Sequence, residues 1–322
     1  MADCEDSDHR HEICGPCRPG LIRAAVCVPQ VRVANPRFNA AQTITLAQQA
    51  HAASAVLALF PELGLTAYSN DDLFHQQALL EAAQVALAEV VQASRDLRPL
   101  LAVGLPLAVD GRLFNCAVAV HEGRVLAVVP KTYLANFREY YEKRQFAGAD
   151  AAVSAEIELL GQRAPFGNDL LLDAADMPGL TLHLELCEDL WTPIPPSTYA
   201  ALAGATVLLN LSASSAAIGK VTYRNRLIAD QARKCIAAYL YSAAGPGEST
   251  TDLAWDGHAV IFEQARLLAE STPFHANGQI VLAEINLHAL HADRLRETTF
   301  RDSAAAHQDR LRAFRRLSFR FH

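Results

Sequence analysis

The stretch LHLELCEDLWTPIPPS, residues 182–197, places one cysteine, Cys187, among three carboxylates, Glu185, Glu188 and Asp189. A thiol must lose its proton to act as a nucleophile, and nearby negative charge makes that loss harder. The apolar run before Cys187 is typical of a strand, and the Pro-rich run after it is typical of a turn. Cys187 is therefore predicted at the carboxyl end of a strand, the edge at which α/β sheets bind ligands. The chemistry then needs a positive charge from elsewhere in the chain.

Two other apolar runs end in the same way. AVLALF (55–60) is followed by Pro61 and Glu62, and RVLAVV (124–129) is followed by Pro130 and Lys131. Proline cannot donate to a sheet ladder, so each proline marks the point where strand pairing stops. If the three strands are neighbours, the side chains of Glu62, Lys131 and Cys187 converge on one pocket.

These three residue types form a coherent hydrolytic set. A glutamate can take the thiol proton and later activate water. An ammonium about 4 Å from a thiolate contributes about 4 kcal/mol at an effective dielectric near 20, and it can also stabilise an oxyanion. Attack on an amide or nitrile carbon would give a thioester. Position alone leaves the alternative open that Cys187 is an inert small hydrophobe and that Glu62 and Lys131 are solvated.

The rest of the chain predicts a layered α/β domain over residues 20–290, because buried-type apolar runs alternate with amphipathic ones. Two segments, FNCAVAVHEGRVLAVVPK and GHAVIFEQARLLAE, are predicted hairpins. Residues 1–19 are expected to be a disordered tail, and 291–322 a C-terminal extension or the start of a linker. Within it, LRAFRRLSFRFH is predicted to be a basic amphipathic helix, packed on the body, leading to a further domain, or lying on a membrane. Strands are expected at 21–28, 55–60, 100–106, 114–120, 124–130, 180–186, 205–210, 236–242, 258–262, 266–270 and 279–285, and helices at 39–53, 76–97, 197–204 and 221–235.

Composition favours a cytoplasmic enzyme, and we expect neither a cofactor nor a metal. The formal net charge of −7 over 322 residues gives no reason to expect nucleic acid or a membrane as partner. The polar N-terminus lacks the apolar core of a signal peptide, and seven scattered cysteines argue against a disulfide framework. The CGPC stretch at 14–17 resembles a thioredoxin motif, and with His9 and His11 it could bind zinc adventitiously. It lacks the flanking strand and helix of a redox site, so a loose tail is the preferred interpretation.

Three quoted motifs carry a family resemblance. FPELGLTAYS, VVPKTYLANFREYYEKRQF and LELCEDLWTP are similar to the Glu, Lys and Cys motifs of the nitrilase superfamily of carbon–nitrogen hydrolases. Within it, the chain most resembles the glutaminase domain of glutamine-dependent NAD synthetases. That narrower match rests on the Tyr-Ser pair at 68–69, the aromatic-acidic run after Lys131, PIPPS, and GESTTDLAWDGHAVIFEQARLLAES, and the resemblance covers about residues 20–300.

The resemblance implies a four-layer αββα sandwich, usually assembled into homo-oligomers. It makes Glu62 the general base, Lys131 the oxyanion stabiliser and Cys187 the nucleophile. It also implies that Glu142 braces the site and meets the substrate amino group. Two positions depart from the family pattern: Phe137 replaces a common Tyr, and Lys220 replaces an Arg that can clamp the substrate carboxylate with two donors. The residues implied to line the glutamine pocket are Tyr68, Phe137, Tyr140, Glu142, Trp191, Ser214 and Lys220. Ser69, Glu188 and Asp189 are interpreted as structural turn or cap groups.

The implied reaction is hydrolysis of the glutamine side-chain amide, with delivery of ammonia to an NAD synthetase domain or subunit. The sequence has no Ser-Gly-Gly-x-Asp-Ser phosphate loop, P-loop or GxGxxG. We therefore expect a domain of a longer enzyme, a subunit of a split enzyme, or a free-standing amidase acting on another small amide. A non-catalytic scaffold is the remaining alternative, against which the intact Glu, Lys and Cys argue.

Overall fold

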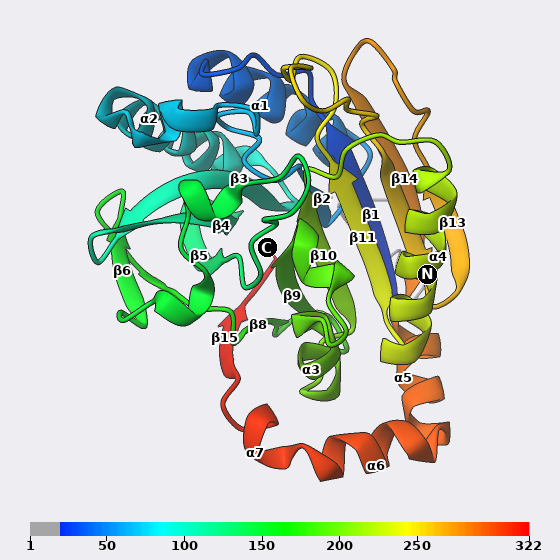
Figure 1. Ribbon diagram of the computed structural model, residues 1–322. Helices are drawn as coiled ribbons and strands as arrows, with labels where there is room; N and C mark the ends of the chain where they lie inside the picture. Colours follow the sequence, from blue (N-terminus) through cyan, green and yellow to red (C-terminus); the bar gives the residue numbers. More distant parts are fainter. Residues whose placement is uncertain (1–19, 322) are drawn as a thin grey trace, which may run out of the picture.

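The computed structural model describes residues 20–321, and two β-sheets packed face to face form its centre (Figure 1). The first sheet has the order β14-β1-β2-β3-β4-β5 and the second β13-β12-β11-β10-β9-β8-β15. A small separate sheet pairs β6 with β7. The strands are β1 (Leu21–Val28), β2 (Leu57–Leu59), β3 (Leu100–Val109), β4 (Arg112–His121), β5 (Arg124–Pro130), β6 (Glu156–Leu159), β7 (Gln162–Pro165), β8 (Leu170–Ala174), β9 (Thr181–Leu186), β10 (Val207–Ser212), β11 (Ala238–Ala243), β12 (Ala259–Glu263), β13 (Arg266–Glu270), β14 (Gln279–Asn286) and β15 (Arg315–Phe319).

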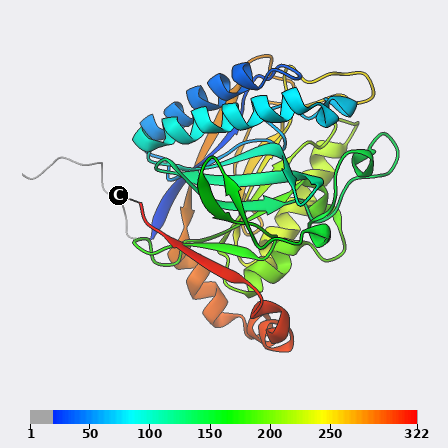
Figure 2. The same ribbon diagram turned by 90° about the vertical axis from the view of Figure 1, so that its left-hand side faces the viewer.

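Helices cover the outer face of each sheet. α1 (Pro36–Ala52) and α2 (Gln77–Ala93) pack on the first sheet, and α3 (Pro196–Leu202) and α4 (Lys220–Cys235) pack on the second. In Figure 2, α1 and α2 lie side by side over the first sheet. α1 begins where Asn35 accepts a hydrogen bond from the Phe38 backbone and Pro36 presets the first turn. The predicted αββα sandwich is confirmed.

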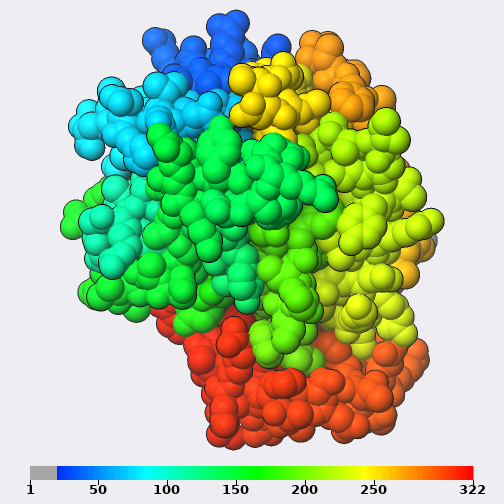
Figure 3. Space-filling view, viewed as in Figure 1, coloured from blue at the N-terminus to red at the C-terminus, as the bar shows by residue number. Residues whose placement is uncertain are grey.

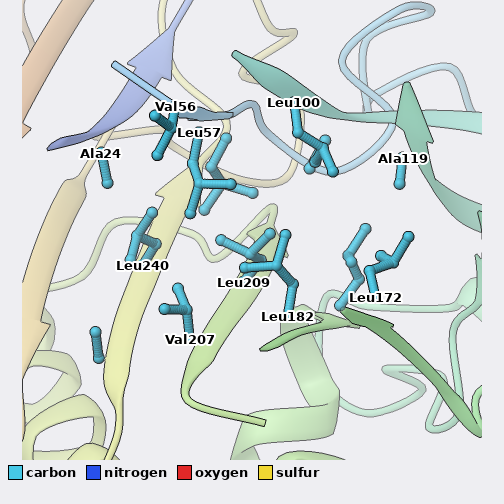
Figure 4. Packing of buried hydrophobic residues seen from close by; sticks show 14 of the residues in the cluster. Ala24, Val56, Leu57, Leu100, Ala119, Leu172, Leu182, Val207, Leu209 and Leu240 are labelled. Atoms are coloured by element: carbon cyan, nitrogen blue, oxygen red, sulfur yellow. The ribbon is translucent and has the colours of Figure 1, made fainter. Parts of the chain in front are cut away.

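The apolar layer between the two sheets holds the sandwich together. Figure 4 shows side chains from the first sheet, such as Leu57 and Leu100, facing side chains from the second, such as Leu182 and Leu209. All four are at most 1% exposed. Burial of a Leu side chain contributes about 1.5–3 kcal/mol, so this layer fixes how the two sets of strand ends meet.

Both predicted hairpins are confirmed: β4 pairs with β5, and β12 with β13, in antiparallel register. The sequence patterns missed β6, β7 and β8. The first two have four residues each, of which only one per strand is buried, so they lack the apolar runs on which the strand predictions depended.

The helix predicted over the basic C-terminal stretch is wrong. Residues Arg315–Phe319 form β15, which pairs in parallel with β8 and extends the second sheet. They alternate in burial, with Phe319 buried and Ser318 exposed, which is the strand period of two. Before β15, the chain runs across the lower part of the molecule in α5 (Leu287–Arg296), α6 (Thr298–Ala306) and α7 (Gln308–Leu311), as Figures 1 and 3 show.

No helix within residues 20–321 is long and apolar enough to cross a membrane. The CGPC stretch at 14–17 lies outside the described residues.

Candidate active site

The site lies where strand ends from both sheets meet. Glu62 follows β2, Lys131 follows β5, and Cys187 follows β9. The three strands are not neighbours in one sheet, the condition under which the sequence brought the side chains together: β3 and β4 separate β2 from β5, and β9 belongs to the second sheet. The two sheets instead bring their ends together face to face, and the Glu62 N–H donates to the Ser212 carbonyl at the end of β10 (3.2 Å).

Gly104 on β3 makes room for the turn that carries Glu62. A Cβ at Gly104 would lie 2.5 Å from the Leu63 nitrogen and 2.8 Å from the Pro61 oxygen. Both are backbone atoms of the turn and cannot move aside, so any side chain here would push the Glu62 turn away from the sheet.

Lys131 is the centre of a buried charge cluster. Its ammonium donates to Glu62 Oε1 at 2.6 Å and to Glu142 Oε1 at 2.7 Å. Asn115 Nδ2 donates to the same Glu62 oxygen at 2.6 Å. Burial raises the pKa of Glu62 to about 7, against the opposing charge of Lys131. Among the described residues, Glu62 Oε2 is a buried oxygen without a hydrogen-bond partner, so it has a free lone pair to accept a proton.

Cys187 begins a short 3₁₀ helix, Cys187–Trp191, at a strained turn. Its φ of 38° lies in the left-handed region, which costs energy for a residue with a side chain. The Cys187 N–H donates to Asn210 Oδ1 at 3.1 Å, which fixes the turn. Burial raises the pKa of the thiol to about 12, while Lys131 and a hydrogen bond from the Ala213 backbone oppose that rise. The resting thiol is therefore protonated and needs a base.

Two of the three carboxylates around Cys187, Glu185 and Asp189, are engaged elsewhere. Glu185 accepts hydrogen bonds from the Tyr239 hydroxyl and the Ser197 N–H. Asp189 accepts from the N–H groups of Leu186 (3.0 Å) and Tyr133 (2.7 Å), so it ties the Cys187 turn to the segment after Lys131. This confirms the structural interpretation of Asp189. Burial raises the pKa of Asp189 to about 8.

Tyr68, Tyr140 and Glu142 line one wall of the site. The Tyr68 hydroxyl donates to Glu142 Oε1 at 2.8 Å, and the Tyr68 and Tyr140 rings meet edge to face at 6.4 Å. The three residues border a small cavity of about 60 Å³. Glu248 fixes the backbone of this wall, because its carboxylate accepts hydrogen bonds from the N–H groups of Tyr68 and Ser69 at 2.8 and 3.0 Å.

Lys220 and Trp191 form a second group beside that wall. Lys220 Nζ donates to Ser215 Oγ at 2.9 Å and lies 5.7 Å from the Trp191 ring centroid. The Ser215 N–H donates to the Tyr140 hydroxyl at 2.8 Å, which joins the two groups.

The remaining two predicted pocket residues differ in exposure. Phe137 is 50% exposed and contacts the Tyr140 ring at 5.9 Å, so it lies at the outer edge of the site. Ser214 is buried, and its hydroxyl accepts a hydrogen bond from Arg224 at 3.2 Å.

Sequence reasoning missed several groups that hold the site. Asn115 and Asn210 are polar residues inside apolar strand runs, and that contrast is the signal that could have identified them. Arg224 and Asp256 carried no such signal, since charged residues are common in helices and turns. Within residues 20–321, no group of three or more His, Cys, Asp and Glu could hold a metal ion.

Curated relatives match nearly the whole chain. The glutamine-dependent NAD(+) synthetases of Mycobacterium tuberculosis and Mycobacterium leprae are each 46% identical to it, over 93% and 94% of this chain. In both cases the match covers 44% of the relative, so this chain spans less than half the length of these proteins.

Solved structures give the same picture of the fold. A glutamine-dependent NAD(+) synthetase from Cytophaga hutchinsonii superimposes with a TM-score of 0.73 at 25% identity, covering 82% of this chain and 43% of that one. An amidase of the nitrilase superfamily from Nesterenkonia AN1 has a TM-score of 0.67 at 21% identity, covering 87% and 97% of the two chains. The family model of carbon–nitrogen hydrolases matches residues 23–294. This chain therefore belongs to the carbon–nitrogen hydrolase family.

Proposed function

We propose that this chain hydrolyses the side-chain amide of glutamine through a Cys187 thioester and supplies the ammonia to an NAD synthetase domain or subunit. The observation that carries the proposal is the buried group at the strand ends: Lys131 bonded to Glu62, with Cys187 close enough for both charges to affect its pKa. The 46% identity to glutamine-dependent NAD(+) synthetases supports glutamine as the substrate.

The proposed acylation uses Glu62 as the base. As the sulfur of Cys187 attacks the amide carbon, the thiol proton moves to Glu62, whose Oε2 is free to accept it. The carbonyl oxygen gains the negative charge, and Lys131 with backbone N–H groups after Cys187 stabilises it. When the C–N bond breaks, Glu62 returns the proton to the leaving nitrogen, and ammonia departs.

Deacylation uses the same residues, with water as the nucleophile. Glu62 takes a proton from a water molecule that attacks the thioester carbon, and Lys131 again stabilises the oxyanion. The C–S bond breaks, the thiolate of Cys187 recovers the proton from Glu62, and glutamate is released. The pKa of Glu62, raised by burial to about 7, suits a group that must accept and return a proton near neutral pH.

The two charged ends of glutamine have counterparts in the proposed pocket. Glu142, with Tyr68 bonded to it, is assigned to the substrate amino group, and Lys220 to the α-carboxylate. Trp191, Tyr140, Ser214 and Phe137 would form the walls. Lys220 supplies one point charge where a guanidinium would supply a fork, so we expect weaker carboxylate binding than an arginine would give.

The test is mass spectrometry of the protein trapped with an electrophilic glutamine analogue. The expected adduct maps to the peptide that contains Cys187, and Cys187→Ala abolishes both the adduct and ammonia release. Cys116 and Cys235 are buried thiols with raised pKa values and serve as internal controls. An adduct on either of them, or full activity in Cys187→Ala, contradicts the proposal. Efficient hydrolysis of other small amides with glutamine ignored would indicate a free-standing amidase instead.

A further inference from the structure

A second buried ion pair lies beside the site. Arg224 on α4 and Asp256, in the connection between β11 and β12, are 0% and 1% exposed. Arg224 Nη1 donates to both carboxylate oxygens, at 3.2 and 3.0 Å. Asp256 Oδ1 also accepts the His258 N–H at 3.1 Å, so the carboxylate is itself held in place.

The other arm of the guanidinium reaches the segment between β10 and α4. Arg224 Nη2 donates to Ser214 Oγ and to the Ser215 carbonyl, both at 3.2 Å. A lysine could keep the charge but has no planar fork with which to bond Asp256 and two groups of this segment together.

That segment is part of the active-site wall. The Ala213 backbone hydrogen-bonds to the Cys187 sulfur, and this contact lowers the pKa of the thiol against the larger effect of burial. Two residues on, the Ser215 N–H bonds the Tyr140 hydroxyl. A shift of this segment would therefore move a donor to the nucleophile and a wall of the pocket at once.

We propose that Arg224, aligned by Asp256, is a positioning residue for the nucleophile: it holds the 213–215 segment so that the Ala213 backbone faces the sulfur of Cys187. The inference rests on the proposed function for its kinetic part. The Arg224–Asp256 pair supports the position of Cys187 from the second sheet, whereas the Lys131 cluster lies on the first sheet. Arg224 does not touch the reacting atoms and acts through the backbone that it fixes.

The ion pair alone does not account for Arg224. A buried pair replaced by uncharged residues of similar size is often neutral or stabilising, because the desolvation cost disappears with the attraction. The guanidinium also donates hydrogen bonds to the Ser215 carbonyl and the Ser214 hydroxyl, and its removal leaves both groups without this donor. Fold stability and thiol positioning can therefore be separated by removing both charges.

The experiment compares Arg224→Met, the double variant Arg224→Met/Asp256→Asn, and Arg224→Lys. The double variant leaves no unpaired charge, and Asn keeps an acceptor for the His258 N–H. Three quantities are measured: Tm, the pH profile of iodoacetamide alkylation at Cys187 by peptide mapping, and kcat and KM for glutamine. The matched control is Arg233→Met/Glu297→Gln, which removes an ion pair of 2.7 Å from the same helix away from the segment.

For the double variant we expect a Tm near that of the wild type but a misplaced thiol. To reach the alkylation rate of the wild type, the double variant should need a pH higher by about one to two units. This shift corresponds to the loss of one hydrogen bond to a charged group. The kcat should fall about a hundredfold with KM little changed, as a displacement near 1 Å causes. Arg224→Lys should keep Tm and recover only part of the alkylation profile. The control pair should leave the alkylation profile and kcat unchanged.

Recovery of both Tm and the wild-type alkylation profile in the double variant would overturn the proposal and leave Arg224 a purely structural role. If the double variant does not fold, Ser214→Ala decides, because it removes one contact of Arg224 with the segment and leaves the ion pair intact. A smaller shift to higher pH supports the proposal, and no shift overturns it. If the wild type ignores glutamine, the proposed function fails, yet alkylation at Cys187 still tests the positioning role.

Discussion

Lys131 Nζ lies 2.6 Å from Glu62 Oε1, and both side chains are completely buried. The pair joins the ends of two strands, β2 and β5, that do not touch each other in the sheet. Glu142 holds the same ammonium from the other side at 2.7 Å. The position of the ammonium is therefore set by two short contacts, which leaves little tolerance for a different cation.

Lys131→Ala should lose nearly all activity while the fold survives. Loss of one oxyanion-stabilising group costs about 10²–10³ in kcat, and here the same group also supports the thiolate. Lys131→Arg should fail as well, since the wider guanidinium does not fit between two carboxylates placed for a point charge. Steady-state ammonia release and circular dichroism measure the two effects. An arginine variant that kept more than about a tenth of wild-type turnover would show that the geometry is less strict than this.

The pH dependence of kcat/KM should report the ionisation of Glu62. The base must be deprotonated to accept the thiol proton, and burial raises its pKa to about 7. Activity should therefore be lost as the pH falls through about 7 and reach a plateau above it. Asn115→Leu removes a hydrogen bond that lowers this pKa, so the acid limb should move to higher pH. At pH values above the acid limbs of both profiles, the wild type and Asn115→Leu should have the same kcat/KM. An unmoved limb would mean that another group titrates.

The sequence predicted the parts of the site that depend on strand ends. A proline after an apolar run marks the end of a strand, so the positions of Glu62 and Lys131 could be inferred locally. How those ends meet could not, because the pairing order of β2 to β5 and the facing of two sheets depend on contacts far apart in the chain. Arg224 and Asp256 show the same limit: they are 32 residues apart, and only the packed structure brings them together.

The C-terminal strand illustrates a conflict between local helix propensity and strand pairing. Arg and Leu in LRAFRRLSFRFH favour a helix on propensity, yet β8 offers an open edge and the apolar side chains alternate. Tertiary pairing prevails over local propensity there, and a sequence pattern alone does not reveal a free sheet edge.

Phe319→Ala should lower the free energy of unfolding by about 3 kcal/mol, as large-to-small changes of buried aromatic residues do. Phe319 is 8% exposed, and its ring packs edge to face on Phe321 at 5.0 Å and on His121 at 5.8 Å. Urea unfolding measures the change. Ser318→Ala, an exposed neighbour on the same strand, should stay within about 0.5 kcal/mol. Equal effects of the two changes would mean that β15 contributes little to the sheet.

Lys220→Ala should raise KM for glutamine about tenfold or more with kcat nearly unchanged, because a bond to a carboxylate is worth about 1.5–3 kcal/mol. Lys220→Arg should lower KM, since the fork can make two bonds. A small neutral amide without a carboxylate is the control substrate, and neither change should alter its KM. If both substrates respond alike, Lys220 shapes the pocket near Ser215 and does not bind the carboxylate.

The segment 137–145 is the expected point of control by a synthetase partner. Glu142 in this segment bonds Lys131, while Phe137 and Tyr141 are 50% and 40% exposed and available for contact. A small shift of the segment would misplace both a substrate contact and the Lys131 ammonium. A two-state segment whose active form lies about 2.7 kcal/mol above the inactive one would suppress turnover about a hundredfold.

We therefore expect slow glutamine hydrolysis by the chain alone and faster hydrolysis when a cognate synthetase, ATP and the acid substrate are added. Free ammonia is wasted without its consumer, and the buried Lys131, Glu62 and Cys187 give substrate little open access at rest. Steady-state ammonia release with and without the partner measures the effect, and Cys187→Ala with the partner gives the background. Tyr141→Ala should reduce the stimulation more than the basal rate, because it removes an exposed contact of the segment and no residue assigned to the substrate or to catalysis. Fast turnover that the partner does not change would exclude this form of control and place the chain with self-sufficient amidases.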